Sequence, residues 1–267
     1  TVTSGVVTTT AIDGGTYYIR SCADLKLIDN MSATYLLIGS DKTQYPEIDC
    51  TDVEIDSIGT DGDKFAGLFD GNNGRILGLG KPLFGYTDGA TIRDLGLRDV
   101  DINVNTEAAG LILNAEGTNI SRVFVTGKIV STGANAAGIA GTLRNSNISY
   151  SYFNGNIEAD YRASGIVNDA TDSRIHQVYT AGKITTGKFA TGIAGFIEGS
   201  ESSITESFVV VTLLSKNSAV NEGDLLYLAG VEKGDYNSVT LEKLGYVKHD
   251  NGNPNAHPAC WKVKGYS

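Results

Sequence analysis

A repeat of 27 to 29 residues is the feature that most constrains the fold of this 267-residue chain. An isoleucine that follows a polar turn marks each unit, at Ile92, Ile120, Ile148, Ile175 and Ile204. A glycine keeps step with it, at Gly110, Gly138, Gly165 and Gly192. A unit of this length, with two or three apolar runs and no helical periodicity, cannot bury its own apolar face. It must stack on its neighbours.

Stacked copies of one coil place each strand beside its equivalent about 4.8 Å away, in long parallel sheets. The 33 glycines, dispersed among Ile, Val, Thr, Asn and Ser, also favour short strands and tight turns over helices. The repeat therefore predicts an all-β parallel β-helix, a solenoid of about 27–28 residues per coil, in which the isoleucines form one interior ladder. One extra residue before Ile102 predicts a bulge.

Two sequence features resemble a known family. One is the stretch 65–79, which reads Phe-Ala-Gly-Leu-Phe-Asp-Gly-Asn-Asn-Gly-Arg-Ile-Leu-Gly-Leu, and the other is the Gly-Ile-Ala-Gly at 138–141 and 192–195. Both are similar to the GLUG-motif repeats of bacterial surface and secreted proteins, and the similarity extends over about 65–214. The resemblance implies a right-handed β-helix, often part of a larger adhesin, with no set of catalytic residues.

The repeat defines three regions. Residues 65–218 are the expected β-helix, between an N-terminal cap at 1–64 and a C-terminal cap at 219–267. Caps are expected because the open sheet edges at the two ends of a β-helix invite end-to-end pairing. Within the first cap, Ser21 and Asp24 form a capping box that predicts a short helix.

Charge and cysteine content limit the environment and the partners. With 31 acidic and 21 basic residues the net charge is −10, which argues against nucleic acid, and no apolar run is long enough to insert into a membrane. The sequence begins at Thr1 without a charged segment and an apolar stretch ahead of the globular pattern, so we expect that any targeting peptide has already been removed. Cys22 and Cys50 are candidates for a disulfide, which leaves Cys260 unpaired. We expect an extracellular or bacterial cell-surface location.

The alternation of side chains predicts a row of outward-facing aromatic residues. With Val123, Val125 and Ile129 directed inward, the outer face carries an aromatic strip, defined as Phe124, Tyr152, Tyr179 and Phe208. The flanking positions hold Lys128, Asn156 and Lys183. These residues are either a stacking ladder that stabilises the sheet or a surface that binds a glycan or a protein. A register shift of one residue would bury the rings instead.

Other residues offer weaker sites. Zinc ligands are conceivable at His249, Asp250, His257 and Cys260, although the sequence around them is typical of a polar loop. Calcium could bind near 61–63 or 49–56, but neither segment matches a known calcium loop. His176 is not accompanied by a serine or cysteine in the sequence context of a nucleophile, which argues against a catalytic triad. Carboxylates for glycoside cleavage could come from Asp94, Asp99, Asp101, Asp169 and Asp172, for which solvated turns are the simpler interpretation.

These observations predict a non-enzymatic surface or secreted module for binding and adhesion, without a catalytic site or metal and, calcium aside, without a cofactor. Its partner would be a glycan or a protein on a host or neighbouring cell, bound through the side or the end of the β-helix. The module would belong to a larger chain or an oligomeric fibre. Two alternatives stay open, a carbohydrate-active β-helix enzyme (lyase or glycosidase) and a structural spacer.

Overall fold

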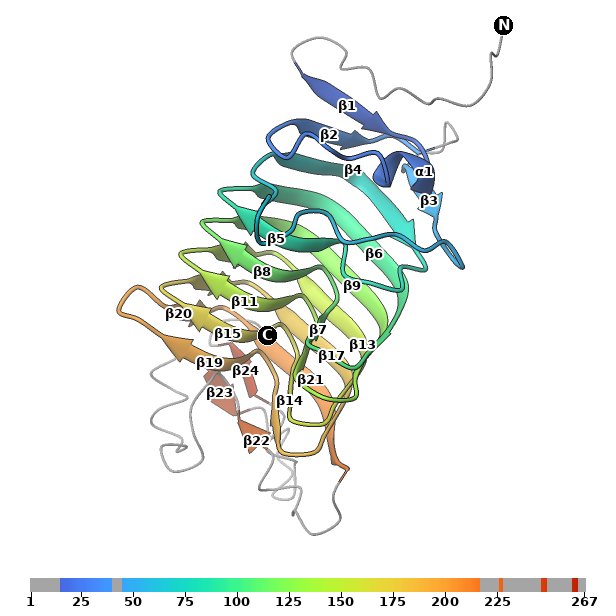
Figure 1. The fold of residues 1–267 in the computed structure, drawn as a ribbon. Coiled ribbons are helices and arrows are strands. Elements are labelled where there is room, and N and C mark those ends of the chain that lie inside the picture. Colours follow the sequence, from blue (N-terminus) through green and yellow to red (C-terminus); the bar gives the residue numbers. More distant parts are fainter. Residues whose placement is uncertain (1–14, 40–44, 217–225, 228–245, 249–260, 264–267) are drawn as a thin grey trace, which may run out of the picture.

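A computed structural model of the chain describes residues 15–39, 45–216, 226–227, 246–248 and 261–263 (Figure 1). Successive coils stack along one axis, and the strands of each coil lie beside those of the next. The described residues are almost entirely strands and turns, with a single helix of four residues, α1 (Cys22–Leu25). The predicted all-β parallel β-helix is confirmed.

Three parallel sheets form the sides of the coil within the described residues. The long sheet contains β1 (Thr16–Ile19), β2 (Thr34–Leu37), β3 (Glu47–Asp49), β4 (Leu68–Leu77), β6 (Thr91–Val104), β9 (Asn119–Ser131), β12 (Asn147–Ser149), β13 (Tyr152–Ala159), β16 (Arg174–His176), β17 (Tyr179–Thr186), β20 (Ser203–Thr205) and β21 (Phe208–Ser215). The second sheet contains β5 (Phe84–Asp88), β8 (Ile112–Glu116), β11 (Ala140–Arg144), β15 (Val167–Thr171) and β19 (Ala194–Glu198).

The short sheet completes the coil with β7 (Ala108–Ala109), β10 (Ala136–Ala137), β14 (Arg162–Ser164), β18 (Phe189–Thr191) and β22 (Leu226–Tyr227). Apart from these sheets, β23 (Tyr246–Lys248) pairs antiparallel with β24 (Trp261–Val263). The division into caps at 1–64 and 219–267 stays a prediction. The parallel pairing of the long sheet reaches back to Thr16, because β1 pairs with β2 and β2 with β4.

The isoleucine ladder forms as predicted. Each isoleucine pairs in register with its equivalent in the next coil, from Ile92 through Ile120, Ile148 and Ile175 to Ile204. Every member is at most 2% exposed. The ladder runs through the core because a period of two residues fixes which face of the strand is buried.

The glycine repeat has a different cause, which is contact between backbones. A Cβ atom on Gly138 would lie 2.0 Å from the carbonyl oxygen of Gly165, and one on Gly165 would lie 1.9 Å from that of Gly192. Any side chain at these positions would collide with the next coil. Glycine therefore recurs at this corner for lack of space rather than to bind a ligand.

Backbone corners interrupt the long sheet at a fixed offset. Two residues after each isoleucine anchor, the chain adopts a positive φ between 48° and 54°, at Asp94, Arg122, Tyr150, Gln177 and Glu206. The bulge expected before Ile102 is also present, since the pairing of β6 with β9 shifts register between Leu97 and Val100. In the later coils these corners separate β12 from β13, β16 from β17 and β20 from β21.

A disulfide joins Cys22 to Cys50, with their Cα atoms 5.6 Å apart. It ties α1, whose N-cap is Ser21 as the capping box predicts, to the residue that follows β3. The short helix therefore has a covalent link to the next coil. This position suits an oxidising compartment, where such bonds persist.

Removal of this disulfide by Cys22→Ser with Cys50→Ser should lower the free energy of unfolding by about 3 to 4 kcal/mol, the entropic value for a loop of this length. The two cysteines are 28 residues apart in sequence. Urea titration of the double variant beside the oxidised parent measures the difference. An unchanged midpoint would show that the bond does not restrain the unfolded chain.

Candidate functional site

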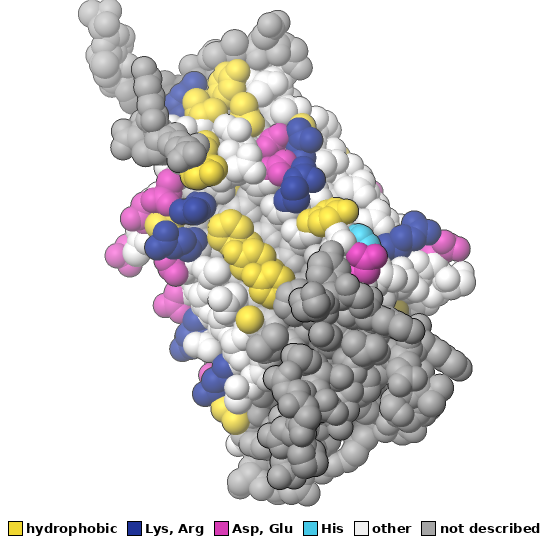
Figure 2. All heavy atoms as spheres, turned by 180° about the vertical axis from the view of Figure 1, so that it is seen from behind, with side chains coloured by type: hydrophobic (Ala, Val, Ile, Leu, Met, Phe, Trp, Pro, Cys, Tyr) yellow, Lys and Arg dark blue, Asp and Glu magenta, His cyan; other side chains and the backbone are white. Residues whose placement is uncertain are grey.

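The aromatic strip lies on the outer face of the long sheet. The rings of Phe124 and Tyr152 stack with centroids 5.3 Å apart and an interplanar angle of 9°. Those of Tyr152 and Tyr179 are 4.6 Å apart at 10°. The backbone of Phe208 continues the register beside Tyr179, but its side chain is outside the described residues. A diagonal run of hydrophobic side chains crosses this face in Figure 2.

Local geometry explains why the rings face outward. Val123 and Val125 are buried on either side of Phe124, which is itself half-buried. The first ring of the strip, that of Phe124, lies over Gly96 of the preceding coil, where a Cβ atom would be only 2.1 Å from Cζ of Phe124. The ring thus covers bare backbone of the preceding coil. Burial, with a smaller contribution from Tyr152, raises the pKa of Tyr179.

Polar residues run parallel to the strip. Lys128, Asn156 and Lys183 occupy one register row and are exposed. Among the described residues neither lysine forms an ion pair, so both ammonium groups are available to a partner. The structure therefore brings together all the residues that the sequence predicted for this surface, apart from the side chain of Phe208.

Two of the candidate catalytic carboxylates, Asp94 and Asp99, lie on the long sheet and form ion pairs. Arg122 holds Asp94 through a bond of 2.9 Å from Nη2 and a second from Nε, and this pairing lowers the pKa of Asp94. Asp99 pairs with Arg98 at 3.1 Å. Asp101 is exposed on the same strand. A carboxylate with a lowered pKa, such as that of Asp94, is a poor general acid at neutral pH.

The remaining carboxylates lie near the second sheet. Asp169 pairs with Arg162 at 2.9 Å, and the Arg162 guanidinium lies over the ring of Phe196, 4.3 Å from its centroid. Burial raises the pKa of Asp169, and Arg162 opposes that rise. Asp172 accepts a bond from the backbone of Glu201 in a turn. Each carboxylate therefore has a structural role.

A metal site is absent from the described part of the chain, where no group of three or more His, Cys, Asp or Glu side chains converges. His176 contacts Thr205 and the ring of Tyr150. In the acidic segment 49–56, where calcium was conceivable, Asp49 accepts a bond from the backbone of Thr51 and Asp56 accepts one from Lys81. The zinc candidates His249, Asp250, His257 and Cys260 all lie outside the described residues.

A crevice beside α1 escaped the sequence analysis. Its lining includes Met31, Ile58 and Asp63, none of which belongs to the repeat. The one sequence feature that pointed to this region was the Asp61-Gly62-Asp63 turn, and it suggested only a calcium site.

Among the described residues, no helix has the length and apolarity of a membrane span.

Comparison with known proteins consistently finds similarity to proteases. Residues 51–127 match the family model described as the M26 IgA1-specific metallo-endopeptidase N-terminal region. The chain is 32% identical over 169 residues to the zinc metalloprotease ZmpC of Streptococcus pneumoniae serotype 4, covering 60% of this chain and 8% of the relative. It is 30% identical over 226 residues to an immunoglobulin A1 protease of Streptococcus pneumoniae, covering 82% of this chain and 10% of the relative. A Streptococcus sanguinis immunoglobulin A1 protease is 28% identical over 190 residues, covering 64% and 10%.

The resemblance to GLUG-motif adhesins is therefore wrong. The family model that matches describes a metallo-endopeptidase region. The glycines and isoleucines that carried the resemblance are imposed by the coil itself, through backbone contact at Gly138 and burial at Ile148. Such residues report the geometry of a β-helix more strongly than its family.

The functional predictions that followed from this resemblance need correction as well. A non-enzymatic adhesion module, its glycan ligand and the carbohydrate-active alternative all conflict with relatives named as proteases. The expectation of no cofactor is also wrong, since one relative is named a zinc metalloprotease. An extracellular location is consistent with these relatives and with the Cys22–Cys50 disulfide.

Within the described ranges the residues nevertheless do not fit a catalytic zinc. Zinc peptidase sites use two histidines and a carboxylate, often as His-Glu-x-x-His, and no segment of the sequence has that spacing. His176 is the one histidine in the described ranges, and its ring nitrogen Nδ1 bonds to Thr205. The chain spans a tenth or less of the relatives it matches.

Proposed function

We propose that this chain is a β-helical segment of a secreted or surface-attached zinc endopeptidase, where it holds the protein substrate while residues elsewhere in that enzyme supply the zinc centre. The similarity to immunoglobulin A1 proteases over 82% of the chain carries the proposal. The sequence has no His-Glu-x-x-His segment and the described residues contain no converging set of metal ligands, which supports the division of labour.

The aromatic strip is the surface that we assign to substrate contact. Three stacked rings offer a rigid, half-exposed area, and aromatic residues are enriched at protein interfaces. The adjacent Lys128 and Lys183 add two cations that form no ion pair within the described ranges, and Asn156 adds an amide. A regular β-helix keeps these groups at fixed spacing, which lowers the entropy lost on binding.

Biolayer interferometry of the chain against immobilised immunoglobulin A1 tests this role. We expect binding in the micromolar range, of about −8 kcal/mol, for the parent chain. The variant Tyr152→Ala with Tyr179→Ala should bind at least about tenfold more weakly, because it removes the centre of the strip. A folded double variant that binds like the parent would exclude the strip as the contact surface.

The matched control is Tyr161→Ala, which removes a tyrosine that is 43% exposed and lies outside the strip. It should bind like the parent chain. Circular dichroism and thermal melting establish that each variant is folded. If the parent chain does not bind immunoglobulin A1, the substrate-holding role is wrong for this substrate.

A further inference from the structure

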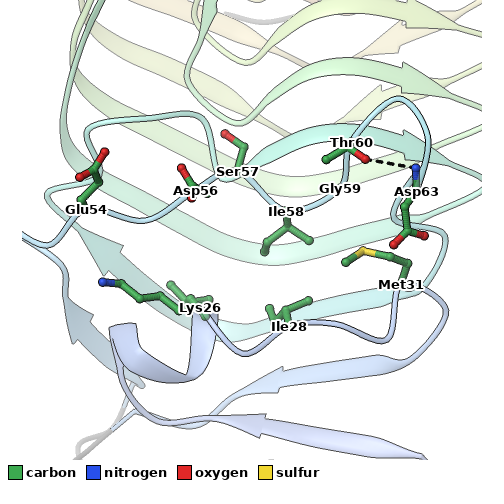
Figure 3. A pocket seen from close by; sticks show the side chains of 11 residues that line it. Lys26, Ile28, Met31, Glu54, Asp56, Ser57, Ile58, Gly59, Thr60 and Asp63 are labelled. Carbon is green, nitrogen blue, oxygen red and sulfur yellow. Dashed lines mark hydrogen bonds between the residues drawn. The ribbon is translucent and has the colours of Figure 1, made fainter.

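A crevice of about 430 Å³ opens between the residues that follow α1 and the loop 54–63 (Figure 3). Its apolar lining comes from Leu25, Ile28, Met31 and Ile58. Leu25 and Ile58 belong to the buried core, whereas Ile28 and Met31 are half-buried and face the opening. The base of the crevice is therefore formed by well-packed apolar core residues. Its sides can change conformation more easily, since the methionine side chain is flexible and adjusts to a bound group.

The crevice exists because two neighbouring coils separate here. Ile58 bonds toward the following coil, donating to Leu83 and accepting from Gly85, both at 2.8 Å. The preceding coil rejoins further along, where Ala66 donates to the carbonyl of Met31 at 2.7 Å. Between these points the loop and residues 26–30 face each other across open space (Figure 3).

Charge is unequal at the two ends. At one end Glu54 and Asp56 share a single ammonium group, that of Lys81, at 3.3 and 2.8 Å, and Lys26 also lines the crevice (Figure 3). At the other end Asp63 and Met31 both line the crevice (Figure 3). Within the described residues Asp63 forms no ion pair. This end joins an unpaired negative charge to an apolar base, in a chain whose net charge is −10.

We propose that this crevice binds an arginine side chain presented by an extended segment of a protein partner. The aliphatic stem would lie against Ile28, Met31 and Ile58, and the guanidinium would bond to the Asp63 carboxylate, with the Thr60 hydroxyl beside it. A residue preceding the arginine would use the remaining apolar space near Leu25. The proposal is independent of the aromatic strip and of immunoglobulin A1.

Arginine fits better than the alternatives. An acidic guest would meet three carboxylates in the lining, at Glu54, Asp56 and Asp63. A purely apolar guest would make no use of the exposed Asp63 carboxylate at the end of the crevice, which forms no ion pair among the described residues. Arginine is more weakly hydrated than lysine and offers a planar fork that matches a carboxylate.

Nuclear magnetic resonance of the ¹⁵N-labelled chain tests the proposal, with N-acetyl-Leu-Arg-amide as the probe. We expect saturable amide shifts confined to residues 25–31 and 54–63, with a Kd in the millimolar range. The uncharged analogue N-acetyl-Leu-Gln-amide should bind at least about tenfold more weakly, since it lacks the charge-assisted bond. Equal affinity for the two peptides, shifts centred elsewhere, or no shifts would overturn the proposal.

A pair of single substitutions identifies the anchoring carboxylate. Asp63→Asn should weaken the arginine peptide about tenfold and leave the glutamine peptide unchanged. Asp61→Asn removes the same charge from the same exposed turn but from a residue outside the crevice lining, so it should have little effect. If the two variants lose affinity equally, general charge attraction explains the binding and the crevice is not an arginine site.

Discussion

Replacing Ile148 with aspartate should unfold the β-helix or drive it into aggregates. Ile148 is fully buried and pairs in register with Ile120 on one side and Ile175 on the other. A carboxylate there would be placed among apolar side chains without a partner. The expected loss in the free energy of unfolding is above about 4 kcal/mol, which is a large part of the total stability of a domain.

Ser149→Asp provides the control for this substitution. Ser149 follows Ile148 directly, but its side chain is half-buried and alternates to the other face of β12. Circular dichroism and urea titration should show a folded chain, destabilised by less than about 1 kcal/mol. If Ser149→Asp unfolds the chain and Ile148→Asp does not, the assignment of inner and outer faces is wrong.

The coil was predictable because each unit repeats one physical environment. Isoleucine recurs where successive coils bury the same position, and the two-residue period then sets the face on which Phe124 and Tyr152 lie. The backbone corners could not be predicted in this way. Glycine, asparagine and aspartate usually signal a positive φ, yet here Arg122, Tyr150 and Gln177 adopt it.

The two candidate surfaces differ in how far sequence reasoning reached them. The aromatic strip was predicted, since it repeats with the coil. The crevice was not, because it forms where Ile58 bonds to the following coil and residues 26–30 remain apart from the loop. A gap between two non-repeating segments leaves no periodic signal. The similarity to proteases was also hidden, because residues that build the coil carry no chemistry specific to proteolysis.

A substitution in the glycine repeat distinguishes a steric cause of that repeat from a functional one. Gly138→Ala should lower the free energy of unfolding by about 3 kcal/mol or more. The new Cβ would lie 2.0 Å from the carbonyl oxygen of Gly165 and 2.6 Å from Cγ of Phe153. Both neighbours are held in place, one by coil stacking and the other by full burial in the core.

Gly62→Ala is the matched control, because a Cβ there has no heavy atom within 4 Å and Gly62 lies in an exposed turn. Its stability should stay within about 0.5 kcal/mol of the parent, as measured by the same urea titration. Equal stabilities of the two variants would mean that the coils can move apart at Gly138. The glycine repeat would then need an explanation other than backbone contact, and its value as a marker of the coil corner would be lost.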